Sequence, residues 1–187
     1  MHSTKLPPMN VNIYDPQKCS CIEYGFTNSP FGRCLMAFTS QGLCALEFVD
    51  DSEEEAVIEK MRRKWNDLWV YRSNMVDARF NFTRYLPDDD RSGVDLCLRG
   101  TPFQICVWRK LLEIPTGSTV SYSELAASIG RPDAVRAVSA AVAANHIGFV
   151  VPCHRVIRND GSAGKFRWGT LCKKAMIEWE RNLLLGQ

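Results

Sequence analysis

The sequence predicts an α+β fold in which a small antiparallel sheet with a helix is packed on a mainly helical second domain. Two observations carry this prediction. The β-patterned runs "GRCLMAF" and "LCALEFV" are separated only by "TSQG", which is typical of a hairpin. From residue 101 onward, apolar residues recur at helical spacing and helix caps follow one another closely. We therefore expect an arm over residues 1–26, an α/β domain over 27–98 and a helical domain over 99–187.

The remaining elements of the first half follow in chain order. Residues 1–26 show no clear periodicity, which is why we interpret them as an arm. Residues 51–69, "DSEEEAVIEKMRRKWNDLW", carry acids in the first turn and Lys and Arg later, the order that the helix dipole favours. "PDDDRSG" at 87–93 interrupts the chain, and "VDLCLRG" at 94–100 alternates like a strand. This half shows no catalytic motif.

The second half predicts four helices and one buried strand. Thr101 and Pro102 suit the cap and first position of the helix "TPFQICVWRKLLEI". "SYSELAASIG" begins with a capping box and stops at Gly130, after which Pro132 opens "PDAVRAVSAAVAAN". Two short helices joined by a tight glycine turn predict a helix-turn-helix. "IGFVV" is expected to be a buried strand, and "TLCKKAMIEWERNLL" to be the last helix.

Charge and side-chain size favour a nucleic-acid partner for the second half. Lys and Arg exceed Asp and Glu by six in residues 99–187, whereas acids exceed by four in 1–98. The second helix of the pair is nearly all Ala, Val and Ser apart from Arg136, so its backbone could approach a groove closely. An ordinary helical hairpin with a basic surface is the alternative.

Composition indicates an intracellular protein without metal or cofactor. The eight cysteines and a start without a basic or strongly apolar stretch favour a reducing compartment, cytoplasmic or, in a eukaryote, nuclear. No apolar run is long enough for a membrane span. "CSC" at 19–21 is too short for a zinc motif, and the three histidines lack ligand spacing.

In "VVPCHRVIRNDG", Cys153 is followed directly by His154. Among the eight cysteines it is therefore the strongest candidate for a nucleophile. A thiol attacks as the thiolate, so it needs a base, and adjacent side chains rarely face each other. We expect a water or a bend to link the two, and a third group to orient the imidazole, with Glu178 and Glu180 as candidates. A buried structural cysteine is the alternative, as it is for the other seven.

These motifs together resemble the O6-alkylguanine-DNA alkyltransferases, above all the C-terminal half of the bacterial adaptive-response regulator. The resemblance rests on "PCHRV", on "SYSELA" and the helix from Arg136 to Asn145 before it, and on "GKFRWG" and Glu180 after it. It extends from about residue 27 to 184. It implies a ribonuclease H-like first domain and irreversible, single-turnover transfer of an alkyl group from O6-alkylguanine to Cys153.

The resemblance also implies roles for individual residues. Cys153 would accept the alkyl group, His154 would act as base through a water, and Glu180 would orient His154. Asn145 would stabilise the turn between the second helix of the pair and the active-site strand, and Tyr122 would supply a phenol to the departing guanine. The implied DNA-binding residues are Tyr122, Ser123, Arg131, Arg136 and Asn159, with Arg136 replacing the extruded nucleotide, and the implied base-pocket residues are Val156, Phe166 and Arg167.

The expected partner is duplex DNA with O6-alkylguanine, bound through the minor groove by a monomer, and O4-methylthymine is left open as a substrate. Arg167 and Trp168, where some relatives have small residues, predict a pocket that favours methyl over benzyl, whereas Gly148 replaces a wall proline. The zinc ligands of some relatives are not matched, nor is the regulator's four-cysteine module. A non-catalytic module that recognises alkylated DNA and a Cys–His hydrolase are the rival readings.

Overall fold

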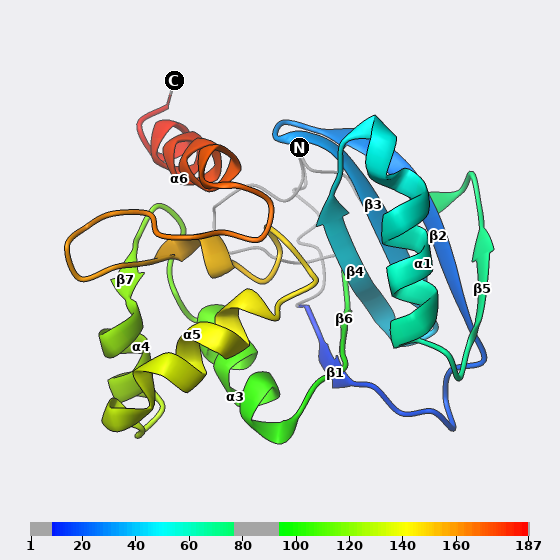
Figure 1. Cartoon of the computed structure of the whole chain (residues 1–187), viewed down its shortest axis with the longest axis horizontal. Coiled ribbons are helices and arrows are strands. Elements are labelled where there is room, and N and C mark those ends of the chain that lie inside the picture. Colours follow the sequence, from blue (N-terminus) through cyan, green and yellow to red (C-terminus); the bar gives the residue numbers. More distant parts are fainter. Residues whose placement is uncertain (1–8, 77–93, 187) are drawn as a thin grey trace, which may run out of the picture. The chain divides into compact units, whose positions relative to one another are not determined.

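The chain divides into two compact units between Arg99 and Gly100 in the computed structural model, which describes residues 9–76 and 94–186 (Figure 1). The expected domain boundary at residue 98 lies one residue before this division. The chain break predicted at 87–93 and the first eight residues of the expected arm lie outside the described residues. Each unit is therefore described by itself.

The first unit is built on a mixed six-stranded sheet. The pair of β3 (Gly32–Thr39) and β4 (Gly42–Phe48) is antiparallel, as the hairpin pattern predicted, and β2 (Cys21–Ser29) also pairs with β3 in antiparallel orientation. The pairs of β1 (Val11–Ile13) with β6 (Leu96–Leu98), of β4 with β6 and of β2 with β5 (Trp69–Arg72) are parallel. The expectation of an antiparallel sheet was therefore wrong at both edges, because parallel partners distant in sequence share no turn that a local pattern could reveal. In spatial order the strands are β1 (Val11–Ile13), β6 (Leu96–Leu98), β4 (Gly42–Phe48), β3 (Gly32–Thr39), β2 (Cys21–Ser29) and β5 (Trp69–Arg72).

The expected arm over residues 1–26 was wrong for the part that the structure describes. β1 pairs with β6, and the backbone N–H of Tyr14 extends the pairing by donating to the carbonyl of Leu98 at 2.9 Å. Residues 21–26 belong to β2, where Ile22 and Tyr24 face the core. A three-residue strand whose partner lies some 85 positions away is too short for a periodicity of its own.

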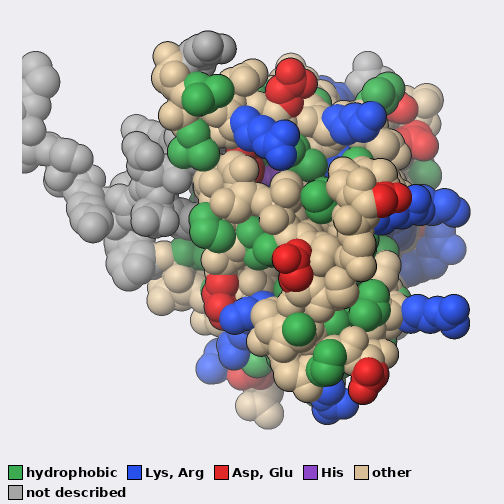
Figure 2. Space-filling model, turned by 90° about the vertical axis from the view of Figure 1, so that its left-hand side faces the viewer, with side chains coloured by type: hydrophobic (Ala, Val, Ile, Leu, Met, Phe, Trp, Pro, Cys, Tyr) green, Lys and Arg blue, Asp and Glu red, His purple; other side chains and the backbone are tan. Residues whose placement is uncertain are grey.

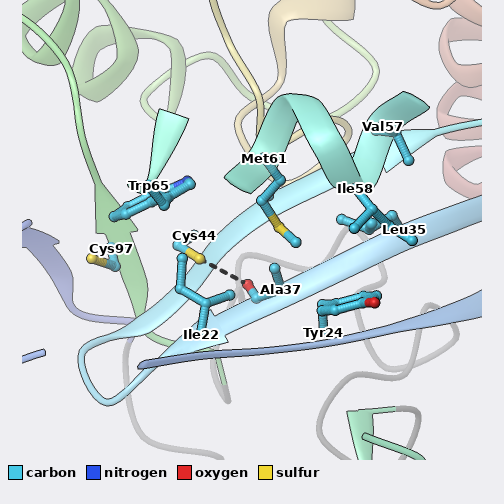
Figure 3. Packing of buried hydrophobic residues seen from close by; sticks show 11 residues of the cluster. Ile22, Tyr24, Leu35, Ala37, Cys44, Val57, Ile58, Met61, Trp65 and Cys97 are labelled. Atoms are coloured by element: carbon cyan, nitrogen blue, oxygen red, sulfur yellow. Dashed lines mark hydrogen bonds between the residues drawn. The ribbon is translucent and has the colours of Figure 1, made fainter. Parts of the chain in front are cut away.

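Helix α1 (Glu54–Lys64) covers one face of this sheet after a 3-10 turn at Asp51–Glu53 (Figure 1). In Figure 3 its side chains Val57, Ile58 and Met61 point toward the strands, and the thiol of Cys44 donates to the carbonyl of Ala37 at 3.3 Å. The helix ends five residues before its predicted end. Trp65, only 1% exposed, is buried in the core instead, and Trp69 already begins β5.

Gly42, at the start of β4, provides a test of the sheet. Its φ of +130° disfavours any side chain, and an added Cβ would lie 2.2 Å from the carbonyl oxygen of Asp95. We expect Gly42→Ala to lower the free energy of unfolding by about 3 kcal/mol, measured by urea denaturation. Gly32→Ala is the control. Gly32 has a φ of +112° but open space around an added Cβ, so this variant introduces backbone strain without a steric clash. Equal losses in the two variants would contradict the steric argument.

The second unit contains the helices that the sequence predicted. The predicted capping box forms at Ser121 with Glu124, and Thr101 caps its helix as predicted and forms a second box with Gln104. Gly130 turns the chain at a φ of +70°, and α4 and α5 pack against each other, with a short 3-10 turn at Pro132–Ala134 in place of the first turn of the second helix. The elements are α3 (Pro102–Leu111), β7 (Val120–Ser121), α4 (Tyr122–Ser128), α5 (Val135–Ala143), β8 (Val156–Ile157) and α6 (Thr170–Leu184).

The run "IGFVV" is buried as predicted, but it is not a regular strand. Apart from an isolated bridge at Ile147 it forms turns, and Phe149 has a φ of +64°, which is rare for a side chain of this size. A short apolar run identifies burial but not backbone conformation. Within residues 9–76 and 94–186, no helix has the length and apolar character needed to cross a bilayer.

Candidate active site

A cavity of about 420 Å³ in the second unit contains Cys153 in its wall. The cavity is formed by α5, by the N-terminus of α4 and by the loop that follows β8. Cys153 is only 3% exposed and lies in a 3-10 turn, Cys153–Arg155, that follows the buried 147–151 run. The lining residues are Tyr122, Arg136, Ser139, Ala140, Val142, Ala143, Asn145, Cys153, Arg158, Gly164, Lys165, Phe166, Arg167 and Trp168.

Asn145 connects the end of α5 to the cysteine. Its side-chain amide donates to Cys153 Sγ at 3.1 Å and to the carbonyl of Val151 at 2.9 Å, while its Oδ1 accepts from the N–H of Ile147 at 3.0 Å. Burial raises the pKa of the Cys153 thiol to about 11, although this hydrogen bond acts in the opposite direction. The resting cysteine is therefore a thiol, and it needs a base in order to react.

His154 is fully buried beside the cysteine, and its ring is held on two sides. Nε2 lies 2.8 Å from Glu180 Oε1, and the ring stacks on Phe149 at 5.8 Å between centroids. Burial lowers the pKa of His154, so the imidazole is neutral. A neutral ring that donates from Nε2 to a carboxylate leaves Nδ1 as an acceptor, and Nδ1 is buried without a partner among the described residues. This atom is suited to take a proton.

Glu180 is the carboxylate that orients His154, and Glu178 is exposed on the same helix. Arg155 also binds Glu180, with Nη2 at 2.6 Å from Oε1, and the N–H of Gly117 donates to Oε2 at 3.0 Å. Burial alone would raise the pKa of Glu180, but the hydrogen bonds from His154 and Arg155 lower it to about 2. Glu180 therefore carries a negative charge at neutral pH, and its contacts hold it in one position.

Lys173 on α6 is buried next to residues that line the cavity, although it is not a lining residue itself. Its ammonium donates to the carbonyls of Val156 at 2.5 Å and Ala163 at 2.6 Å, and it lies 6.0 Å from the ring centre of Tyr122. Burial lowers the pKa of Lys173 to about 8, and burial likewise raises that of Tyr122. The positive charge of Lys173 also lowers the pKa of Cys153, so it favours the thiolate.

The structure brings most of the residues singled out from the sequence to this cavity. Tyr122, Arg136, Phe166 and Arg167 line it together with Cys153 and Asn145. Val156 is not among the lining residues of this cavity; its side chain is completely buried, and its backbone carbonyl accepts from Lys173.

Three further residues expected at a DNA surface lie outside the cavity lining. Ser123 donates to the side-chain carbonyl of Asn159 at 2.7 Å, which ties the start of α4 to the loop after β8. Arg131 is exposed at the turn between α4 and α5. Their positions leave them accessible to a ligand that covers α4 and α5.

Arg155, Lys173 and Phe149 belong to the site, although the sequence interpretation did not single them out. One signal was available for the lysine. Lys173, Met176 and Glu180 recur three and four positions apart on α6, so two charged side chains share the buried face of an amphipathic helix. A charged residue at a core position is rarely buried without a partner, and such positions indicate a functional network.

The protonation of Cys153 can be tested by alkylation. Since the pKa of this thiol is about 11, the rate of its modification by iodoacetamide should rise about tenfold per pH unit between pH 7 and 9. Asn145→Ala removes the hydrogen bond that favours the thiolate and should lower the rate at each pH. Peptide mass spectrometry measures modification at Cys153 alone. A rate that is already constant above pH 7 would show a preformed thiolate instead.

No group of three or more His, Cys, Asp or Glu side chains in the described ranges is arranged to hold a metal ion. All eight cysteines have free thiols.

Two family models match the chain. The 6-O-methylguanine DNA methyltransferase DNA binding domain matches residues 102–182, and the ribonuclease-like domain of the same enzymes matches residues 22–86. The second match agrees with the ribonuclease H-like first domain that the resemblance implied. The first match covers every residue of the cavity.

Curated relatives and solved structures agree with these models. The chain is 36% identical over 162 residues to the methylated-DNA–protein-cysteine methyltransferase of Mycobacterium bovis, covering 86% of this chain and 93% of that protein. It is 40% identical over 166 residues to the regulatory protein ada of Salmonella typhimurium, covering 85% of this chain and 45% of that protein. The chain thus spans about half the length of the regulatory relatives that it matches.

The fold matches that of the Mycobacterium tuberculosis O6-methylguanine methyltransferase, with a TM-score of 0.69, 32% identity and coverage of 89% of this chain and 99% of that one. A structure of the M. tuberculosis protein OGT in complex with DNA matches with a TM-score of 0.67 and 32% identity, over 86% of this chain and 93% of that one. The chain therefore belongs to the methylated-DNA–protein-cysteine methyltransferase family.

Proposed function

We propose that this protein repairs DNA by transferring the alkyl group of O6-alkylguanine, chiefly O6-methylguanine, irreversibly to Cys153. The observation that carries the proposal is that Cys153 lies in the wall of a cavity and is followed in the chain by His154, which is hydrogen-bonded to Glu180 and keeps Nδ1 as an unpartnered acceptor. The family and the DNA complex of a similar protein support duplex DNA as the partner.

The reaction is a single in-line displacement. His154 Nδ1 takes the proton of Cys153 through a water, and Glu180 stabilises the imidazolium that forms. The thiolate attacks the alkyl carbon, an S–C bond forms, and the bond from that carbon to guanine O6 breaks. The electron pair stays with guanine, which is protonated with the help of Tyr122. A thioether has no good leaving group, so each molecule reacts once.

The lesion reaches Cys153 only if the nucleotide leaves the stack, because the cysteine lies in a cavity wall at 3% exposure. Flipping costs a few kcal/mol. Arg136, exposed on α5 at the cavity, occupies the gap in the duplex and offsets part of this cost. The small side chains of α5 permit a close approach in the minor groove. The protein acts as a monomer in this proposal.

Two rival functions make different predictions. A recognition module for alkylated DNA has no use for a cysteine held by the Asn145 amide next to a histidine that is hydrogen-bonded to Glu180, and this chain has both. A Cys–His hydrolase needs donors placed to stabilise an oxyanion near the thiol, and the Asn145 amide donors at this position are already bound to Val151, Ile147 and Cys153 itself. The geometry therefore favours alkyl transfer.

The deciding experiment is mass spectrometry of the intact protein and of its peptides after reaction with duplex DNA that contains one O6-methylguanine. We expect one added methyl group per chain, located on the Cys153 peptide, with the reaction stopping at one equivalent. DNA with unmodified guanine is the control. Tight lesion binding with an unmodified Cys153 would establish a recognition module and contradict the proposal.

The cavity should transfer methyl faster than benzyl. Phe166 and Trp168 pack edge to face at 5.2 Å and both line the cavity next to Arg167, so a benzyl ring has to fit against bulky side chains. We expect benzyl transfer to be at least about tenfold slower, because displacing packed side chains to admit a larger group costs about 1–3 kcal/mol. Trp168→Ala should raise the rate of benzyl transfer relative to methyl. Equal rates for both groups in the unmodified protein would show that the pocket is not restrictive.

A further inference from the structure

The cavity around Cys153 is lined by four cationic side chains and by no acidic one. Arg136 belongs to α5, and Arg158, Lys165 and Arg167 belong to the loop after β8. All of the lining residues lie within the described part of the chain. A flipped guanine is uncharged, so the base itself does not require this concentration of positive charge.

Arg167 is the lining cation that is tied most directly to the reacting sulfur. Its Nη1 donates to the backbone carbonyl of Asn145 at 3.2 Å, and the side chain of the same Asn145 donates to Cys153 Sγ at 3.1 Å. The guanidinium charge acts on the thiol, because it lowers the pKa of Cys153. A group attached to the carbon under attack would therefore lie within electrostatic reach of Arg167.

Arg158 provides a second cation that acts on Tyr122. Gly164 has a φ of +67°, and a Cβ at this position would lie 3.3 Å from Arg158 Nε, so the absence of a side chain lets the arginine lie along the loop. Its charge lowers the pKa of Tyr122, which places it near the phenol. Positive charge in the cavity thus acts both on Cys153 and on Tyr122.

We infer that the cavity favours O6-alkyl groups with an anionic substituent, of which carboxymethyl is the smallest, and that Arg167 determines this specificity. The inference rests on the proposed function and names a substrate class for the same site. In the reaction Cys153 forms an S–CH2 bond, and the bond from that carbon to guanine O6 breaks. The electron pair and the proton from the thiol go to guanine, which leaves S-carboxymethylcysteine.

The physical reason is charge compensation in a partly buried site. A carboxylate that enters a neutral cavity loses its hydration, and it also repels the approaching thiolate. A guanidinium offsets both effects through a charge-assisted hydrogen bond. In water the like charges make a carboxymethyl group a poorer partner for a thiolate than its uncharged amide. A preference for carboxymethyl must therefore originate in the protein.

Positive charge near DNA also binds phosphates, so the test must separate the two roles. Figure 2 shows Lys and Arg side chains projecting from several places on one side of the molecule, with Asp and Glu side chains scattered among them. Phosphate binding of this kind affects every lesion in the same duplex equally. A ratio of rates between two lesions in identical DNA cancels it.

The experiment compares transfer from O6-carboxymethylguanine and from its uncharged isostere O6-carbamoylmethylguanine in one duplex sequence, with O6-methylguanine as reference. We expect the unmodified protein to transfer carboxymethyl about tenfold faster than carbamoylmethyl. Arg167→Gln should bring the ratio to about one or below. Arg109→Gln removes the same charge from the exposed face of α3, outside the cavity lining, and should leave the ratio unchanged. Transfer from O6-methylguanine shows that each variant is folded.

A ratio of one or less in the unmodified protein, or a high ratio that survives in Arg167→Gln, would overturn the inference while methyl transfer still supports the proposed function. Absence of methyl transfer by the unmodified protein would overturn both. If Arg167→Gln does not fold, Arg167→Lys replaces it as the test, because lysine keeps the positive charge but lacks the planar guanidinium with its paired donors. The lysine variant should show an intermediate ratio, and an unchanged one would contradict the role of the guanidinium.

Discussion

A Cys153→Ser variant should lose alkyl transfer by a factor of at least about 10⁴ while it still binds DNA that contains O6-methylguanine. The substitution replaces one atom and keeps an acceptor for the Asn145 amide, which lies 3.1 Å from the sulfur. A serine hydroxyl is a much weaker acid than a thiol, and the neutral His154 is too weak a base to ionise it. Binding depends on α4, α5 and the cavity walls, which the substitution leaves in place.

Two measurements check this result. Single-turnover transfer from O6-methylguanine should be undetectable in Cys153→Ser, and lesion binding by gel shift should stay within about threefold of the unmodified protein. Cys106→Ser makes the same chemical change at an exposed position of α3 and should transfer at the normal rate. Methylation of another cysteine in the Cys153→Ser protein would place the acceptor elsewhere and would remove the basis of the proposed mechanism.

Local signals in the sequence were sufficient for most of the second unit. The capping boxes at Thr101 and Ser121 and the glycine turn at Gly130 each depend on residues within a few positions of one another. Helix α6 begins and ends where its pattern predicted, at Thr170 and Leu184. Such elements are determined by short-range geometry, so a single sequence reveals them.

Long-range contacts account for what the sequence did not reveal. β1 pairs with a strand some 85 positions later, and no pattern within residues 9–14 indicates that partner. The residue pattern alone left Glu178 and Glu180 open for the same reason, and only the resemblance named Glu180, because the packing of α6 decides which of the two meets His154. The cavity lining, with Arg158 and Lys165, also depends on how a loop folds over α5.

Glu180→Gln should cause the second large effect, on both stability and transfer. The carboxylate accepts from the buried His154 and Arg155, so its neutralisation leaves Arg155, 5% exposed, without its counter-charge. Breaking a buried pair in this way costs about 3–5 kcal/mol of unfolding free energy. Transfer should fall by about 10² or more, because the imidazolium that forms when His154 takes the proton loses its stabilising charge.

The pH dependence of stability tests whether the charge of the Glu180 carboxylate accounts for this loss of unfolding free energy. The pKa of Glu180 is about 2 in the folded protein, below its ordinary value of 4.5, so its contribution is fully present above pH 4.5 and is lost as the pH falls toward 2. The difference in unfolding free energy between the unmodified protein and Glu180→Gln should therefore be constant from pH 7 to 5 and should shrink by about 3 kcal/mol below that range. Urea denaturation at each pH measures it.

Glu178→Gln is the matched control, since it removes the same charge from an exposed position two residues earlier on α6. It should change neither the acid dependence of stability nor the rate of transfer, because surface charges of this kind contribute less than about 1 kcal/mol. If Glu180→Gln and the unmodified protein lost stability in parallel below pH 5, the charge on Glu180 would not stabilise the fold. In that case the packing of Phe149 would have to hold His154, and the carbonyl of Ile114 and the hydroxyl of Thr116 would have to hold Arg155.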